Sequence, residues 1–364
     1  MDILIIHASA GAGHKKAAEA LTSRIKETTP WNAVCVDALD LTHPIIKNLY
    51  QQTYVNMVTK IPWAWGFIFS ILDFPCLQGL IRFGRRCYNR LNFYGVEKYL
   101  VEKNFDWIVC TQFLSEEVAA SLKRRGKIKS KILCIVTDFD VHRIWISPGV
   151  DFYAGASEFS RNKLLQLGVA PEHAFETGIP TDKKFSKVFD RPALRKQLGL
   201  DEKMFTVLIA TGSFGSGPIE ELIDQLKDYQ LIVVCGHNQT LFKHLSQKPL
   251  VHVKVCGLVN NMDELMSAAD AMITKPGGLS ISEALVKNLP MIFFSAIPGQ
   301  ETNNVQVLRR YDISSGLCDS LSDIVQAVKS LSASPQTLSD AREKSKQLAK
   351  PSAVDEIIRI IQTH

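Results

Sequence analysis

The feature that most constrains the fold is a short unit that occurs twice: an apolar run typical of a strand, a glycine-rich loop and a helical stretch. Residues 2–7 and the loop 9–14 begin the first unit, and residues 205–210 and the loop 211–218 begin the second. Strands buried on both faces of a parallel sheet read as continuous apolar runs, as these do. The pattern therefore predicts an α/β fold with two doubly wound, Rossmann-like domains.

The order of the apolar runs predicts the domain boundaries. A first series of strands and helices ends near Pro180, and the series restarts at residue 205. We expect a first domain over 1–180, a polar linker over 181–201 and a second domain over 202–364, whose C-terminal helices could pack back on the first domain. Within the first domain, residues 41–96 break the regular alternation and form an aromatic-rich insertion. A length of 364 residues suits two domains.

Composition excludes several classes of protein. With 46% hydrophobic and 22% charged residues, the chain is not disordered, collagen-like or a coiled-coil rod. A net charge of +5 is too small to indicate nucleic acid as a partner. The eight cysteines include no C-x-x-C pair, which argues against zinc ribbons and thioredoxin-like sites, and free thiols fit the cytosol. The first residues read as a strand and not as a signal peptide.

The first candidate motif is the loop Ser9-Ala10-Gly11-Ala12-Gly13-His14, between a strand and a helix. Its glycines allow a ligand to approach the backbone, and a helix N-terminus attracts anions. The third glycine of a dinucleotide fingerprint is missing, but Asp37 follows at a plausible distance, so a Rossmann cofactor stays open. His14 is either a histidine that caps the helix or a general base.

Two further motifs follow strands. Asp138 comes directly after the run 131–137 and is followed by His142 and Trp145, at a strand end where open α/β sheets bind ligands, although Asp138 could also be a turn or N-cap residue. The loop Gly212–Gly217 suits a phosphate but lacks the Lys-Ser/Thr of a Walker loop, which disfavours ATP hydrolysis.

The strongest motif is residues 274–284, where a Pro-Gly-Gly turn joins a strand to a helix expected to start at Ser280. Lys275 and the exposed amides can hold a diphosphate. Glu283 can accept hydrogen bonds from both ribose hydroxyls, or it can form a capping box with Ser280. In the segment 297–304, Gln300 and Glu301 suit sugar hydroxyls, and a solvated helix start is the alternative.

These five motifs in this order resemble the diacylglycerol glycosyltransferases typified by plant monogalactosyldiacylglycerol synthase and the bacterial processive diacylglycerol glucosyltransferases. The resemblance runs from Ile3 to about Asn304. It implies a GT-B fold, in which two Rossmann-like domains face a cleft, the first binding the acceptor and the second the nucleotide-sugar donor.

The resemblance also implies residue roles. His14 matches the acceptor-side histidine and is the expected base; Asp138 is the alternative, because plant-type members have an aspartate where Ser9 stands. The remaining acceptor-side residues are Gly11, Gly13, His142 and Trp145. The donor-side residues are Gly212, Ser213, Phe214, Gly257, Leu258, Val259, Lys275, Gly277, Gly278, Ser280, Glu283, Gln300, Glu301 and Asn304.

The reaction implied is an inverting transfer of galactose or glucose from a UDP-hexose to the 3-hydroxyl of diacylglycerol. No metal ion and no other cofactor is expected, because Ser280, the backbone amides and Lys275 would stabilise the leaving UDP in place of a metal. The alternatives are the N-acetylglucosaminyltransferase that acts on lipid I in peptidoglycan synthesis and a UDP-N-acetylglucosamine 2-epimerase. A nucleotide-sugar-binding regulator would have no need of His14.

A lipid acceptor would explain the insertion. Its expected membrane contacts are Trp63, Trp65, Phe67, Phe69, Arg82, Arg85 and Arg86, and the alternative is a helical subdomain that buries these aromatic residues. Residues 76–131 hold twelve lysines and arginines against five acidic residues. The apolar run 61–72 is too short to span a bilayer. We therefore expect a cytoplasmic protein that binds peripherally to the inner face of the cell membrane, on anionic lipid.

Overall fold

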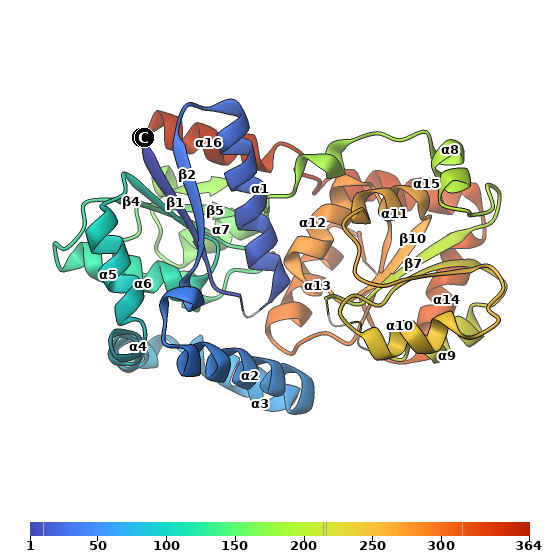
Figure 1. Ribbon diagram of the computed structural model, residues 1–364, viewed down its shortest axis with the longest axis horizontal. Helices are drawn as coiled ribbons and strands as arrows, with labels where there is room; N and C mark the ends of the chain where they lie inside the picture. Colours follow the sequence, from blue (N-terminus) through green and yellow to red (C-terminus); the bar gives the residue numbers. More distant parts are fainter. Residues whose placement is uncertain (10, 214, 216, 315) are drawn as a thin grey trace. The chain divides into compact units, whose positions relative to one another are not determined.

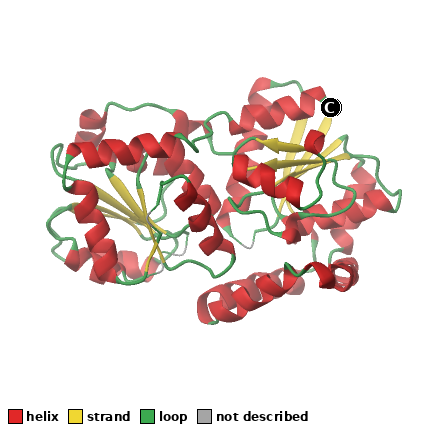
Figure 2. Ribbon diagram, turned by 180° about the vertical axis from the view of Figure 1, so that it is seen from behind, coloured by secondary structure: helices red, strands yellow, loops and turns green. Residues whose placement is uncertain are grey.

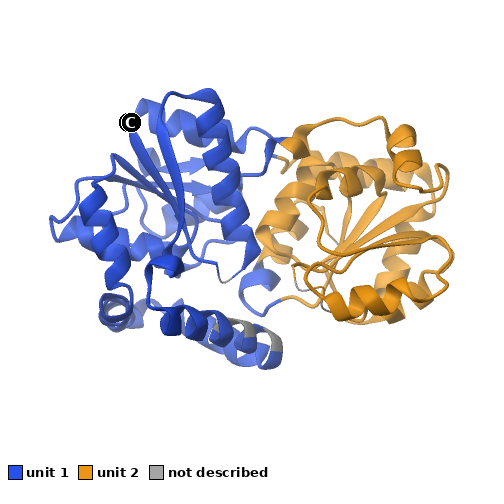
Figure 3. Ribbon diagram, in the orientation of Figure 1, with its two compact units in different colours: residues 1–183, 297–303, 350–364 blue, residues 184–296, 304–349 orange. Residues whose placement is uncertain are grey.

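The computed structural model describes every residue except 10, 214, 216 and 315, and it divides into two compact units (Figure 3). Unit 1 comprises residues 1–183, 297–303 and 350–364. Unit 2 comprises residues 184–296 and 304–349. Neither unit is continuous in sequence, because the chain returns to unit 1 for one short segment and again for its last helix.

Unit 1 has a parallel sheet of six strands in its described residues, in the order β2-β1-β3-β4-β5-β6 (Figure 1). The strands are β1 (Asp2–His7), β2 (Asn32–Asp37), β3 (Trp107–Cys110), β4 (Lys131–Ile135), β5 (Phe152–Gly155) and β6 (Ala174–Glu176). The helices outside the insertion are α1 (Ala12–Thr28), α6 (Phe113–Arg124), α7 (Glu158–Gln166) and α16 (Ala353–Thr363). Figure 2 shows the strands enclosed between helices.

Both faces of this sheet are buried, which explains the uninterrupted apolar runs. Along β1, Ile3 and Ile5 point into a core formed with α1 and α16, whereas Leu4 and Ile6 point into a second core on the side of α6. The alternation follows from the two-residue period of a strand. Ile357 of α16 is completely buried, so the last helix of the chain completes the core of unit 1.

The insertion is helical. It contains α2 (Pro44–Lys60), α3 (Pro62–Leu72) and α4 (Gln78–Asn92), and α5 (Tyr94–Lys103) begins at its end. Phe93, Val96 and Leu100 anchor its end in the core beside α6. Of the described residues, no single helix is long and apolar enough to span a membrane; α2 and α3 meet that test only as a pair bent by 106°.

Unit 2 has a second parallel sheet, again of six strands in its described residues, in the order β12-β11-β10-β7-β8-β9. The strands are β7 (Thr206–Ala210), β8 (Gln230–Val234), β9 (Val253–Cys256), β10 (Ala271–Thr274), β11 (Met291–Phe294) and β12 (Leu317–Cys318). The helices are α8 (Arg191–Gln197), α9 (Ile219–Gln225), α10 (Gln239–Ser246), α11 (Met262–Ala268), α12 (Gly278–Val286), α14 (Leu321–Ser332) and α15 (Pro335–Lys346). The helix α13 (Gln300–Arg310) begins in the returning segment of unit 1 and continues in unit 2. Two Rossmann-like sheets confirm the predicted α/β class.

The residues expected as a linker, 181–201, are more ordered than the sequence suggested. Unit 2 already begins at Lys184, and α8 lies within the expected linker. Arg191 and Arg195 of α8 each form an ion pair of 2.6 Å with Asp270, which is 9% exposed. The polar composition that indicated a linker is therefore the composition of a helix fastened to unit 2 by ion pairs.

Candidate active site

Each of the glycine loops predicted after β1, β7 and β10 follows one of the two strands at which the strand order of its unit reverses. In unit 1 these are β1 and β3, which are adjacent in the sheet although β2 lies between them in sequence. In unit 2 they are β7 and β10. Loops diverge at such a switch point and leave a crevice at the carboxyl ends of the strands, where α/β proteins bind ligands. The sequence predicted the loops but not this pairing.

His14 lies in the first turn of α1, after the N-cap residue Gly11. Its Nδ1 is 2.8 Å from the carbonyl oxygen of Thr111, at the end of β3, and 2.9 Å from Oγ1 of Thr137. A carbonyl can only accept, so Nδ1 carries the proton and Nε2 keeps its lone pair. The Thr111 hydroxyl donates in return to the carbonyl of His14 at 3.0 Å. The histidine is thus held in the tautomer of a general base that acts through Nε2.

The surroundings of His14 keep it neutral. Burial lowers its pKa to about 4, and the bond to Thr111 and the nearby His7 have smaller effects, upward and downward respectively. At neutral pH the imidazole is therefore unprotonated and able to accept a proton. The Trp145 ring lies 6.2 Å from the imidazole, between ring centroids, and is only 2% exposed. Trp145, which we expected on the acceptor side, thus supports His14 from within the core.

Ser9 binds the carboxylate of Asp37, at the end of β2. Its hydroxyl and its amide both donate to Asp37, the amide at 3.2 Å. Asp37 also accepts from the amide of Leu39 at 3.0 Å. A carboxylate therefore lies beside position 9, and it is supplied by the neighbouring strand β2. In plant-type members, by contrast, the aspartate is expected at position 9 of the loop itself. This use of Asp37 differs from the dinucleotide site that the sequence left open.

Gly11 shows where a ligand could approach. A Cβ built on this residue would meet no atom within 4 Å, and its φ of −146° is open to any residue. Packing within the chain therefore does not require glycine here. The open space beside the N-terminus of α1 at Gly11 suits the close approach of a ligand, and Gly13 lies in the first turn of that helix.

The loop after β4 supplies Asp138 and His142, and both are nearly buried. The carboxylate of Asp138 accepts from the side-chain amide of Gln300, with Nε2 3.2 Å from Oδ2. His142 accepts through Nδ1 from the amide of Ile144 at 3.0 Å and donates through Nε2 to the carbonyl of Phe69 at 2.8 Å. Both nitrogens of His142 are therefore occupied within unit 1, and its place is that of a residue that holds the loop.

Gln300 and Glu301, expected on the donor side, belong to the segment of the chain that returns to unit 1. Glu301 accepts from the amide of Ile297 at 2.8 Å and so closes the turn before α13. Asn304, the next predicted residue, is completely buried in unit 2 and donates to the carbonyl of Pro276 at 3.0 Å. Asn304 thus positions the Pro-Gly-Gly turn through its backbone.

In unit 2, α12 starts at Gly278, two residues before the expected start at Ser280. Its N-cap is Gly277, and no side chain caps it. The predicted capping box of Ser280 with Glu283 is therefore wrong, because Ser280 already lies inside the first turn. The uncapped amides and the positive end of this nine-residue helix suit a phosphate, with Lys275 just before it.

The loops after β7 and β9 lie at the same edge of the sheet. Gly212 has a φ of +87°, which favours glycine, and Gly215 approaches so closely that a Cβ would lie 2.1 Å from the carbonyl oxygen of Cys235. Ser213 follows Gly212 in this loop, and the predicted Phe214 lies outside the described residues. Residues 257–259 follow β9, and Leu258 is exposed.

The predicted membrane contacts separate into two groups. Trp63 and Phe67 of α3 are exposed, by 72% and 65%, and Arg86 of α4 is exposed as well. Arg82 and Trp65 are half-buried. Phe69 is buried against His142, with ring centroids 3.9 Å apart.

Arg85 is half-buried as well. It forms an ion pair of 2.7 Å with Glu117 of α6, which is 5% exposed. The structure thus buries Phe69 in unit 1 and engages the half-buried Arg85 with a buried carboxylate of the same unit. The sequence could not separate them from their exposed neighbours, because all of them lie on one amphipathic insertion.

Sequence reasoning missed an apolar stripe on α4. Leu80, Phe83, Cys87 and Leu91 follow one another at helical spacing and are all exposed. Arg86 and Arg90 lie beside them and are exposed too. An apolar helix face flanked by arginines is typical of a helix that lies in a membrane interface.

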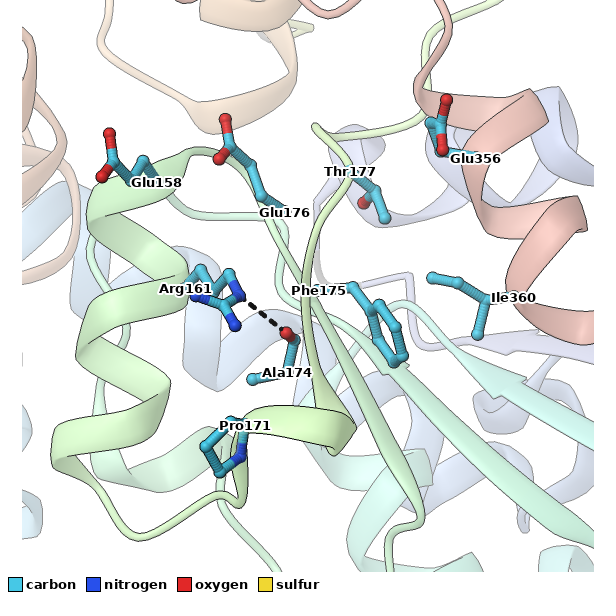
Figure 4. Close-up of a pocket in the computed structure, with 9 residues that line it drawn as sticks. All are labelled: Glu158, Arg161, Pro171, Ala174, Phe175, Glu176, Thr177, Glu356 and Ile360. Atoms are coloured by element: carbon cyan, nitrogen blue, oxygen red, sulfur yellow. Dashed lines mark hydrogen bonds between the residues drawn. The ribbon is translucent and has the colours of Figure 1, made fainter. Parts of the chain in front are cut away.

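A pocket of about 470 Å³ opens elsewhere in unit 1, between α7, β6 and α16 (Figure 4). Its lining includes Glu158, Glu176 and Glu356 together with Arg161, whose Nε donates to the carbonyl of Ala174 at 2.9 Å. None of the predicted site residues lines it. In the described part of the chain, no group of three or more His, Cys, Asp or Glu residues is placed to hold a metal ion.

Comparisons with known proteins cover nearly the whole chain. Residues 14–181 match the family model of monogalactosyldiacylglycerol (MGDG) synthase, and residues 206–357 match the model of the C-terminal domain of glycosyltransferase family 28. Relatives named processive diacylglycerol beta-glucosyltransferase, from Bacillus cereus and Bacillus thuringiensis, are 28% identical over 99% of this chain and 92% of their own.

Solved structures share the fold. MurG of Acinetobacter baumannii has a TM-score of 0.62 at 14% identity, over 100% of this chain and 99% of its own. HepE of Anabaena, solved with UDP-glucose, has a TM-score of 0.56 at 16% identity, and the UDP-GlcNAc 2-epimerase of Neisseria meningitidis has 0.62 at 13%; both matches cover 100% of each chain. The likeness confirms the predicted GT-B fold class.

Proposed function

Because the chain belongs to the family 28 glycosyltransferases that carry an MGDG-synthase N-terminal part, we propose that it transfers a hexose from a UDP-hexose to the 3-hydroxyl of diacylglycerol. The relatives that match the chain from end to end are named for this acceptor and for glucose. Glucose is therefore the proposed sugar, and galactose is the alternative that the assay must exclude.

The observation that carries the proposal is the state of His14. Its Nδ1–H is bound to the carbonyl of Thr111 at 2.8 Å, and its lowered pKa leaves Nε2 free to take a proton at neutral pH. An alcohol is a weak nucleophile unless a base removes its proton as it attacks, and a positioned imidazole supplies that base. The open space beside Gly11 admits the acceptor next to this residue.

The proposed reaction is a single displacement with inversion. The hydroxyl oxygen of diacylglycerol attacks the anomeric carbon of the hexose while its proton passes to Nε2 of His14. The bond between the anomeric carbon and the UDP oxygen breaks, and UDP leaves with the electron pair. The uncapped amides of α12, with Lys275 and Ser280, would stabilise the charge that develops on the diphosphate.

The remaining contacts follow from the resemblance. Glu283, one turn inside α12, would accept hydrogen bonds from the ribose, residues 257–259 would meet the base, and Gln300 with Glu301 would bind the hexose. Asp138 is the alternative base, but its carboxylate already accepts from Gln300. We therefore propose His14 as the base and Asp138 as a residue that orders the site. Catalysis is expected to need no metal ion, so excess EDTA should leave the rate unchanged.

We further propose that the insertion binds an anionic membrane surface, which would place the protein on the inner face of the cell membrane. The exposed Trp63 and Phe67 and the apolar stripe of α4 would enter the interface. Arg82, Arg86 and Arg90 would meet lipid phosphates. No role for nucleic acid is proposed.

One experiment tests the function. The purified chain is incubated with vesicles that contain both diacylglycerol and lipid I and with labelled UDP-glucose, UDP-galactose or UDP-N-acetylglucosamine, and the lipid products are separated. We expect a glucosyl-diacylglycerol. Label transferred only to lipid I, or UDP-N-acetylglucosamine that is epimerised without transfer, would contradict the proposal. The anomeric configuration of the product tests inversion.

A further inference from the structure

The helix α3 packs against the segment that carries Gln300. A Cβ built on Gly66 of α3 would lie only 2.7 Å from Cβ of Pro298. One turn further along the helix, Phe69 covers Gly299, where a Cβ would lie 2.7 Å from Cδ1 of the phenyl ring and where φ is +81°. Two consecutive residues of the turn before α13 therefore rest on two residues of one face of α3.

The same face of α3 also holds the loop after β4. The Phe69 carbonyl accepts from Nε2 of His142 at 2.8 Å, and the two rings are 3.9 Å apart between centroids. Asp73, at the end of α3, accepts from the amide of Arg143 at 3.2 Å. The loop after β4 and the turn before α13 thus share one support.

The two supported segments are joined to each other. Gln300 donates to Asp138 at 3.2 Å, and Asn303 donates to Asp140 at 2.8 Å. Gln300 directly follows the glycine that Phe69 covers. A displacement of α3 would therefore move the Gln300 amide and the Asp138 carboxylate, which it supports through Gly299 and His142.

We propose that Gly66 and Phe69 are positioning residues of the hexose site: they fix the turn Ile297–Gly299 and so set where the Gln300 amide stands relative to Asp138. The inference rests on the proposed function, in which Gln300 binds the hexose. It gives α3 a second task, because Trp63 and Phe67 of the same helix are exposed at the surface. The side chain at position 66 has to be a hydrogen atom, since a methyl group would push Pro298 away.

The variants Gly66→Ala, Phe69→Ala and Phe69→Leu test this proposal. The matched control for Gly66→Ala is Gly79→Ala in α4. Both changes raise the helix propensity in the same way, but a Cβ at position 79 meets no atom within 4 Å and so makes no close contact like that with Pro298. The control for the others is Ser70→Ala, an exposed neighbour whose hydroxyl bonds only within its own helix, to the carbonyl of Gly66.

Rates are measured with a short-chain diacylglycerol in detergent micelles, and vesicle flotation is measured separately. We expect Gly66→Ala and Phe69→Ala to lower kcat/KM for UDP-glucose by roughly ten- to a hundredfold, as small misplacements in active sites do. The inhibition constant of UDP, which lacks the hexose, and flotation should stay within twofold of wild type. Phe69→Leu should recover part of the loss, and both controls should match wild type.

The proposal is overturned if the kcat/KM of Gly66→Ala and Phe69→Ala matches that of their controls. It is also overturned if the affinities for UDP and for UDP-glucose fall by the same factor, or if the loss of kcat/KM parallels a loss of vesicle flotation. Calorimetric affinities for UDP-glucose and UDP on the same variants need no acceptor. They therefore test the positioning role even if wild type transfers nothing to diacylglycerol, which would contradict the proposed function alone. Melting curves identify any variant that does not fold. If the Phe69 variants fail to fold, Gly66→Ala still tests the proposal, because it removes no contact.

Discussion

The side-chain amide of Gln300 donates to the carboxylate of Asp138, with Nε2 3.2 Å from Oδ2, across 162 positions of sequence. Asp138 is 7% exposed, and Gln300 lies at the start of α13. A residue assigned by resemblance to the sugar donor and one assigned to the acceptor side are thus joined directly, within unit 1.

This bond predicts that the two residues act as a unit. Gln300→Ala and Asp138→Ala should each lower kcat/KM, and the double variant should lose much less than the sum, with a coupling free energy of about 1 kcal/mol or more. A double-mutant cycle on kcat/KM for UDP-glucose measures it. Additive losses would show that the contact has no part in turnover.

His14→Ala should lower kcat by roughly a hundred- to ten-thousandfold, the usual share of a general base, because Nε2 would no longer take the acceptor proton. The affinity for UDP, measured by calorimetry, should survive. Lys16→Ala, an exposed change on the same helix, is the control and should have wild-type rates. If His14→Ala kept its turnover, His14 would not be the base, and Asp138 would be the remaining candidate.

The pKa of His14 predicts the acid limb of the pH profile. Burial lowers this pKa from 6.5 to about 4, so the base loses activity only as the pH falls towards 4. The kcat/KM of wild type should therefore be nearly flat from pH 7 to about 5. An acid limb centred near 6.5 would contradict the buried, Thr111-bound imidazole.

The same pKa predicts a change in stability. Since the folded-state pKa is below the unfolded value, the contribution of a neutral His14 is fully present above pH 6.5 and is lost as the pH falls to about 4. The loss amounts to about 3 kcal/mol at most. Urea unfolding of wild type and His14→Gln at pH 8 and pH 4.5 measures it, and His14→Gln should lose less on acidification.

Arg85 and Arg86 are neighbours that should behave in opposite ways. Arg85→Ala leaves the buried carboxylate of Glu117 without its ion-pair partner, although Asn89 still donates to it at 3.0 Å. We expect a loss of roughly 3–5 kcal/mol in the free energy of unfolding. Arg86→Ala, at an exposed position, should change it by less than about 0.5 kcal/mol.

Binding to vesicles gives the second readout for this pair. Arg86→Ala should weaken flotation with anionic vesicles by roughly fivefold, on the basis of about 1 kcal/mol for each basic residue at the surface, and should leave flotation with neutral vesicles unchanged. Equal flotation of Arg86→Ala and wild type on anionic vesicles would remove Arg86 from the proposed membrane contact.

Local signals in the sequence were sufficient for the alternation of strands and helices and for the loops that carry Gly11, Gly212 and Gly277. An apolar run or a glycine turn depends on neighbouring residues, so it can be read from the sequence directly. The start of α12 was misjudged by two residues because a glycine N-cap leaves no side-chain signature. The linker over 181–201 was misjudged because the ion pairs of α8 reach Asp270, far along the chain.

The sequence by itself determined which residues can do chemistry: a histidine at a helix start, a Pro-Gly-Gly turn before a helix, and an aromatic and basic insertion. Only the tertiary structure decided what each of them meets. Thr111 fixes the tautomer of His14 across 97 positions, because β1 and β3 are adjacent at the point where the strand order reverses. Phe69 is buried and Arg85 is half-buried in an ion pair with Glu117, whereas Trp63 and Arg86 are exposed, because burial depends on which helix face packs against the sheet domain. Such partners are chosen by long-range packing, which no local pattern encodes.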